Sequence, residues 1–180
     1  MSKDEARLIR RAKEGDPAAF AEIYDRHQPA IYRYIFYRVD NVATAEELAS
    51  EVFVRLVDSI EDFTYHGRPL LAWLYTIAHN LVTDHYRSTG RATMVPLKGK
   101  LVSNISNPED VAENAFVQRR LAAAIDQLTE GQRHVILLKF FEGLDNKTVA
   151  RILDKSYGAV KSLQHRGLAA LRRILESDEW

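Results

Sequence analysis

The most chemically distinctive stretch of the sequence is a run of basic side chains near its C-terminal end. Five basic residues and no acidic residue fall between positions 155 and 173, namely Lys155, Lys161, Arg166, Arg172 and Arg173. The whole chain has 25 basic and 25 acidic side chains, so its net charge is zero and this positive charge is local. Ammonium and guanidinium groups gathered in this way are suited to contacts with the phosphates of a nucleic acid.

Residue types that catalyse reactions or bind metals do not occur at the spacings that such sites need. Six histidines are present, but no two are four residues apart as in a helical zinc site, and cysteine is absent. Gly99-Lys100 lacks the upstream glycine and the following serine or threonine of a phosphate-binding loop. Nucleophile-elbow and dinucleotide-binding motifs do not occur either. We therefore expect a protein that is not an enzyme and that has no metal and no cofactor.

The basic run lies in a segment that has the pattern of a helix-turn-helix. Ala150 is small enough for a helix crossing, Asp154 tolerates the left-handed turn between the helices, and Ser156 is a good N-cap for the second helix. Six side chains would then project from that helix toward base edges or phosphates: Ser156, Tyr157, Lys161, Ser162, His165 and Arg166. The plainer alternative is a solvated helical hairpin with a basic surface.

Polar rows also occur in the first half of the chain. A helix expected over 44–60 has a charged row formed by Glu47, Glu51 and Arg55, and a long helix over 70–87 has a polar row formed by Asn80, Asp84 and Arg87. Between these helices, the loop over 63–69 is rich in groups that stack on a base or bind it by hydrogen bonds: Phe63, Tyr65, His66 and Arg68. Solvated helix faces and an ordinary connecting loop are the alternatives.

The elements that must position these residues are all helical. Apolar residues recur at helical spacing almost throughout, and no alternating strand pattern is seen. Helices are expected at about 17–26, 29–39, 44–60 and 70–87, and four more after position 107, with capping boxes at Thr44–Glu47 and Thr129–Gln132. The interpretation is an all-α protein of two small helical domains, 10–87 and 107–177, joined by a flexible linker over 88–106, and the C-terminal domain contains the helix-turn-helix.

Two features bear on location. The N-terminal residues have no apolar core that could act as a signal peptide, and the most apolar stretch, 70–78, is far shorter than a membrane helix. We therefore expect a cytoplasmic protein without membrane insertion.

The second half of the chain resembles domain four of the sigma-70 family. The resemblance lies in Gln132-Arg133-His-Val-Ile-Leu-Leu-Lys-Phe-Phe-Glu142-Gly143 and in Ala159-Val160-Lys161-Ser-Leu-Gln-His165-Arg166. In that family this domain reads the promoter −35 element with its recognition helix, which implies the same role for the six projecting side chains above.

The first half resembles domain two of the same family. Ala45-Glu-Glu-Leu-Ala-Ser-Glu-Val-Phe53 is similar to the helix that docks on the polymerase clamp, which implies polymerase contacts at Glu47, Glu51 and Arg55. The pieces Ala72-Trp73-Leu74, Ile77-Ala78-His79-Asn80 and Asp84-His85-Tyr86-Arg87 are similar to the segment that reads the −10 element. In the family the loop before that segment captures a flipped base, and the resemblance implies the same role for the loop over 63–69.

Together these resemblances imply a small, two-domain sigma factor of the extracytoplasmic-function type. It would bind core RNA polymerase and promoter DNA, and family members are commonly held inactive by an anti-sigma factor. Two other functions stay open on the sequence alone. One is a stand-alone helix-turn-helix transcriptional regulator, and the other is a protein-interaction module that has lost DNA binding.

Overall fold

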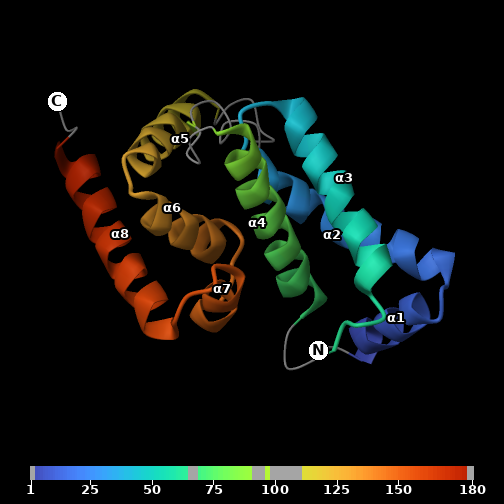
Figure 1. Ribbon diagram of the computed structural model, residues 1–180. Helices are drawn as coiled ribbons and strands as arrows, with labels where there is room; N and C mark the ends of the chain where they lie inside the picture. Colours follow the sequence, from blue (N-terminus) through green and yellow to red (C-terminus); the bar gives the residue numbers. More distant parts are fainter. Residues whose placement is uncertain (1–2, 65–68, 91–95, 98–110, 178–180) are drawn as a thin grey trace. The chain divides into compact units, whose positions relative to one another are not determined.

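A computed structural model describes residues 3–64, 69–90, 96–97 and 111–177, although side chains are described only from residue 116 onward in the last range. Every regular element in these residues is a helix, as the hydrophobic spacing predicted (Figure 1). The chain divides into two compact units, Met1–Arg91 and Ala92–Trp180. The all-α class and the two helical units are therefore confirmed.

The first unit contains α1 (Lys3–Lys13), α2 (Pro17–Phe36), α3 (Val42–Ser59) and α4 (Leu70–Thr89). Helices α2, α3 and α4 pack on one another, and α1 packs on α2. The predicted inner side of α4 is confirmed at Leu74, Ala78 and Leu81, which are buried, whereas His85 is half-buried. Residues 3–9 were left outside the predicted domain, yet Leu8, Ile9 and Ala12 form a buried face of α1.

The sequence-based expectation of two helices around Pro29 is wrong, because α2 continues through this residue. Ile23, His27, Ile31 and Ile35 are buried at successive turns on both sides of the proline. An uninterrupted buried stripe of this kind stabilises one continuous helix by more than the roughly 3 kcal/mol that an internal proline costs.

The start of α3 also differs from the expected capping box at Thr44. The helix begins at Val42, and its N-cap is Asn41, whose side-chain oxygen accepts a hydrogen bond from the Thr44 backbone N–H at 2.8 Å. Thr44 therefore lies within the first turn. Asparagine is as good an N-cap as threonine, and it satisfies an N–H group one turn earlier.

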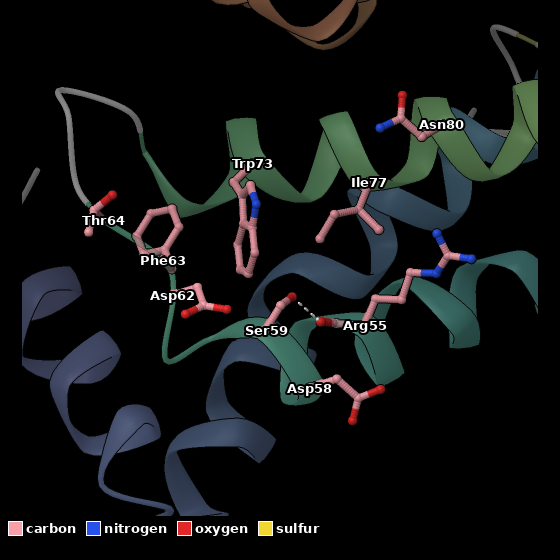
Figure 2. A pocket seen from close by; sticks show the side chains of 9 residues that line it. All are labelled: Arg55, Asp58, Ser59, Asp62, Phe63, Thr64, Trp73, Ile77 and Asn80. Atoms are coloured by element: carbon pink, nitrogen blue, oxygen red, sulfur yellow. Dashed lines mark hydrogen bonds between the residues drawn. The ribbon is translucent and has the colours of Figure 1, made fainter.

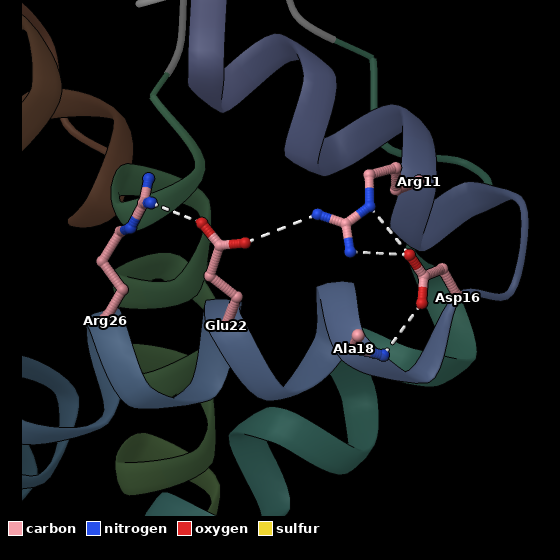
Figure 3. A network of polar contacts seen from close by, with 5 residues as sticks. All are labelled: Arg11, Asp16, Ala18, Glu22 and Arg26. Atoms are coloured by element: carbon pink, nitrogen blue, oxygen red, sulfur yellow. Dashed lines mark hydrogen bonds and ion pairs between the residues drawn. The ribbon is translucent and has the colours of Figure 1, made fainter.

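A chain of ion pairs fixes the corner between α1 and α2 (Figure 3). Arg11 pairs with Asp16 at 2.7 Å and with Glu22 at 3.5 Å, and Glu22 pairs with Arg26 at 2.7 Å. Asp16 is also the N-cap of α2, since its carboxylate accepts from the Ala18 N–H at 2.9 Å. The hydrogen bond from Arg11 and the one from the Ala18 amide both lower the pKa of Asp16.

The second unit contains α5 (Val111–Asp126), α6 (Glu130–Ile136), a π-helical segment η2 (Leu137–Phe141), α7 (Asn146–Ile152) and α8 (Tyr157–Ser177). The predicted capping box at the start of α6 is confirmed, and the Thr129 N–H donates to Gln132 Oε1 at 3.2 Å. Helix α8 packs on α5, α6 and α7. Its last turn is tied to α5 because Arg120 donates to the Leu175 carbonyl at 3.1 Å.

Part of the predicted linker is fixed to this second unit. Leu97 is completely buried, and its N–H donates to both carboxylate oxygens of Asp126 at 2.9 Å. Asp126 also pairs at 3.2 Å with Arg133, whose side chain is 4% exposed. Within the predicted linker, 88–106, the apolar side chain of Leu97 is therefore anchored to the second unit by its burial and by its hydrogen bonds to Asp126.

Candidate nucleic-acid interface

The turn between α7 and α8 has the backbone geometry that a helix-turn-helix needs. Asp154 has φ +49°, and it is the one non-glycine residue with positive φ in the described part of the chain. The Ala159 N–H donates to the Ser156 hydroxyl at 3.1 Å, and the Thr148 N–H donates to the Asp145 carboxylate at 2.8 Å. The predicted turn and the predicted Ser156 cap are both confirmed, and each helix of the pair starts with a side-chain cap.

Helix α8 separates its buried side chains from its exposed ones. Val160, Gly167 and Leu171 are buried, as predicted, and Leu163 is half-buried. The six predicted DNA-contacting side chains are all exposed: Ser156, Tyr157, Lys161, Ser162, His165 and Arg166. The outward face of α8 therefore carries two cationic side chains among hydroxyl and imidazole groups, a mixture that suits both phosphates and base edges.

Close contact with α6 fixes the orientation of this face. A Cβ atom added at Gly167 would lie 3.2 Å from Ile136 Cγ1 and 3.5 Å from Gln132 Cβ. Leu163 in turn lies against Gly131, where an added Cβ would be 3.4 Å from Leu163 Cδ2. Each helix thus has a glycine opposite a larger side chain of the other, so α8 cannot rotate about its axis without a clash.

Two polar contacts reduce the number of side chains available for DNA. Asn146 of α7 donates to the side-chain oxygen of Gln164 at 2.8 Å, which links the two helices of the motif. Arg172 pairs with Glu176 at 2.7 Å on the same helix. Arg172 belongs to the basic run found in the sequence, but its charge is partly compensated here. Lys161 and Arg166, nearer the start of α8, are therefore better candidates for contacts with DNA phosphates.

A pocket of about 510 Å³ opens between α3, α4 and the chain that joins them (Figure 2). Its lining mixes aromatic, carboxylate, amide and guanidinium groups: Arg55, Asp58, Ser59, Asp62, Phe63, Thr64, Trp73, Ile77 and Asn80. The rings of Phe63 and Trp73 lie 4.8 Å apart at their centroids and are tilted by 37°. Such a site can hold a flat group that has several hydrogen-bonding edges, as an unpaired base has.

Of the four loop residues predicted to capture a base, only Phe63 lies within the described part of the chain. Tyr65, His66 and Arg68 lie outside the described residues. Phe63 is only 6% exposed because its ring packs on Trp73, so it forms part of the pocket wall and is not an open stacking surface.

The polar row of α4 is on the surface. Asn80, Asp84 and Arg87 are all exposed, and Asn80 also lines the pocket. Asp84 and Arg87 form an ion pair of 3.3 Å with each other. A pair this exposed contributes little to stability, so both groups stay available for a charged or polar partner.

The charged row of α3 is also accessible. Glu47 and Arg55 are exposed and Glu51 is half-buried, and Arg55 pairs with Glu51 at 3.1 Å. Two valines of the same helix, Val54 and Val57, are each 52% exposed. A helix face that combines charges with exposed apolar side chains is suited to contact with another protein. Arg55, assigned to this row, also lines the pocket with Asn80.

Several pocket residues were not predicted as functional from the sequence. Asp58, Ser59, Asp62, Thr64 and Ile77 line the pocket, but they lie on separate elements. The sequence placed Asp58 and Ser59 on the helix expected over 44–60. It contains no signal, however, that the chain after α3 folds back toward α4 and brings these residues into one pocket. Outside the pocket, the burial of Arg38 was not predicted from the sequence. Its guanidinium group contacts Tyr34 and His79.

The described part of the chain contains no helix that is long and apolar enough to span a membrane. Within the same residues no three histidine, aspartate or glutamate side chains are grouped as metal ligands.

Comparison with known proteins identifies both halves. Residues 23–92 match the family described as Sigma-70 region 2, and residues 118–171 match Sigma-70, region 4. The ECF RNA polymerase sigma factor BldN of Streptomyces coelicolor is 40% identical over 173 residues, which are 95% of this chain and 66% of BldN. SigW of Bacillus subtilis, another ECF RNA polymerase sigma factor, is 31% identical over 93% of this chain and 94% of its own length.

Solved structures show the same fold. CnrH, in complex with the cytosolic domain of CnrY, is similar with a TM-score of 0.70 and 24% identity, over 97% of this chain and 99% of that one. The sigma factor RpoE of Bartonella quintana, in complex with the anti-sigma factor NepR, has a TM-score of 0.66 and 20% identity, over 89% and 98% of the two chains. With the two family regions in their expected order and SigW matched along nearly its whole length, this chain belongs to the sigma-70 family, among the ECF RNA polymerase sigma factors.

Proposed function

We propose that this chain binds core RNA polymerase and directs it to promoters, with the −10 element read and melted by residues 10–87 and the −35 element read by residues 107–177. The observation that carries the proposal is the outward face of α8, where all six predicted contact side chains are exposed on a helix whose rotation is fixed by its glycine contact with α6. The protein itself performs no chemistry in this proposal, since polymerase supplies it.

In the C-terminal unit, Lys161 and Arg166 are the proposed phosphate contacts. Ser156, Tyr157, Ser162 and His165 are the proposed contacts to base edges or flanking phosphates. Because the whole chain has no net charge, its affinity for DNA by itself should be low. Binding to polymerase would place both units on one promoter, so that two weak contacts act together.

In the N-terminal unit, the pocket between α3 and α4 is the proposed site for an unpaired base of the −10 element. Asn80, Asp84 and Arg87 would contact the neighbouring strand. Glu47, Glu51 and Arg55 are the proposed polymerase contacts, and the exposed valines of α3 extend that surface. The residues Tyr65, His66 and Arg68 keep their proposed role in base capture.

The partners and location follow from the same family. We infer that this chain acts in the cytoplasm. We also infer that an anti-sigma factor holds it inactive, because the sigma factor RpoE of Bartonella quintana was solved in complex with the anti-sigma factor NepR. A second function, the stand-alone helix-turn-helix regulator, shares the exposed α8 face but predicts tight DNA binding without polymerase.

Run-off transcription with purified core polymerase tests the proposal. We expect promoter-specific product from core polymerase plus this chain, and little specific DNA binding by the chain alone. Lys161→Ala with Arg166→Ala should abolish the product and lower the salt dependence of promoter binding by about one unit of slope per lost phosphate contact. Arg172→Ala is the matched control on the same helix. Tight specific binding without polymerase, or no product with it, would overturn the proposal.

A further inference from the structure

Helix α4 begins without a cap of its own. Its N-cap is Pro69, whose side chain has no hydrogen-bonding group, and its first turn contains no acidic residue. The Leu70 N–H instead donates to Oε1 of Glu5 in α1 at 2.9 Å. The first N–H groups of a helix need acceptors and form the positive end of its dipole, so a carboxylate is well suited to this place. Helix α1 thus caps a helix that lies 65 residues further along the chain.

The other end of α1 holds the chain that follows α3. Lys13 Nζ donates to the Glu61 carbonyl oxygen at 2.9 Å, just after α3 ends at Ser59. Helix α1 is itself well fixed, because its apolar face is buried and the Arg11–Asp16 ion pair closes the corner with α2 (Figure 3). Helix α1 therefore contacts the connection between α3 and α4 at both of its ends.

The two contacts flank the walls of the pocket. Phe63 comes two residues after Glu61, and Trp73 comes three residues after Leu70, and their rings form one wall together (Figure 2). We propose that Glu5 and Lys13 are positioning residues for base recognition, because they set how the Phe63 and Trp73 rings meet. This inference rests on the proposed function of the pocket.

A fluorescence experiment on the free protein tests the structural half of the inference. Trp180 is replaced by phenylalanine, so that Trp73 is the only tryptophan, and its quenching by acrylamide is measured. Glu5→Ala and Lys13→Ala should each raise the quenching constant by about 1.5- to 2-fold, because local opening exposes the ring. Two control variants remove charges of the same signs from exposed positions of the same helix: Asp4→Ala removes an acidic group and Arg10→Ala a basic one. Both should leave the quenching constant unchanged. Glu5→Gln keeps a hydrogen-bond acceptor, so its quenching constant should lie between that of the unsubstituted chain and that of Glu5→Ala.

Transcription tests the functional half. Run-off product is compared between a promoter and versions that carry one substituted base in the −10 or the −35 element. Glu5→Ala should reduce −10 discrimination by about 3- to 10-fold, which is the effect of losing one hydrogen bond of ordinary net strength. Discrimination at −35 should not change. Unchanged quenching, or equal loss on every template, would overturn the inference. If the unsubstituted chain gives no promoter-specific product, the proposed function is refuted. The quenching experiment uses the free protein, so its result on the role of Glu5 and Lys13 does not depend on that outcome.

Discussion

Replacing Gly167 with alanine tests the close contact between α8 and α6 that fixes the proposed DNA-reading face. Alanine for glycine inside a helix ordinarily stabilises by about 0.5–1 kcal/mol, since the unfolded chain loses freedom. At Gly167, however, the new methyl group would lie 3.2 and 3.4 Å from two carbons of Ile136, closer than the 3.5–4.0 Å that carbon atoms prefer. Ile136 is 2% exposed and has little room to move. Overpacking of this kind costs about 1–3 kcal/mol.

Gly158 of the same helix is the matched control, because a Cβ added there meets nothing within 4 Å. Gly158 lies in the first turn of α8, where alanine gains less helix propensity than at the interior position Gly167. The difference between the two variants is therefore a lower bound on the packing cost, which is about 1–3 kcal/mol. Urea denaturation measures the stabilities, and amide hydrogen exchange assigns the change to α6 and α8. Equal stabilisation by both substitutions would refute the close approach of the two helices.

Three further outcomes are expected from single substitutions. Asp154→Gly should raise the thermal midpoint of the C-terminal unit by relieving a left-handed backbone, a gain of about 0.5–1 kcal/mol, whereas Asp154→Ala should lower it. The hydrogen bond from the Thr148 N–H lowers the pKa of Asp145, so the stability it contributes is complete above the ordinary value of 3.8 and is lost as pH falls through the lower folded-state pKa. Asp145→Asn keeps the cap and should remove this component from an acid titration followed by circular dichroism. Asp126→Ala should destabilise by about 1–3 kcal/mol in urea, because Arg133 stays buried without that carboxylate; a change below the error of the measurement would contradict this.

Local sequence signals predicted the C-terminal motif well because each of its parts is short-range. Ser156 caps a helix that starts at the next residue, and Asp154 adopts the left-handed turn that its short polar side chain tolerates. The burial of Val160 and Leu171 follows from helical spacing. The same kind of reasoning failed at Pro29, where local propensity predicts a break but burial on both sides of the proline keeps α2 continuous.

The pocket could be predicted only in part, because its residues come from separate elements. Phe63 and Asn80 were recognised from the sequence as candidate contacts to the −10 element, but the packing of the Phe63 ring on Trp73 was not. Its burial against Trp73 depends on how the chain turns after α3, and that turn depends on contacts with α1. No pattern within residues 61–70 contains this information.

By itself, the sequence determined the helical class, the caps of α6 and α8, the helix-turn-helix and the family, because these depend on residue types at fixed short spacings. Only the tertiary structure decided that Glu5 caps α4, that Leu97 is held by Asp126, and that Arg55 and Asn80 line one pocket. The physical reason is the range of the interactions. A cap or a turn is settled by neighbours within about one helical turn. A hydrogen bond between residues far apart in the chain forms only where the packing of whole helices brings its two ends together.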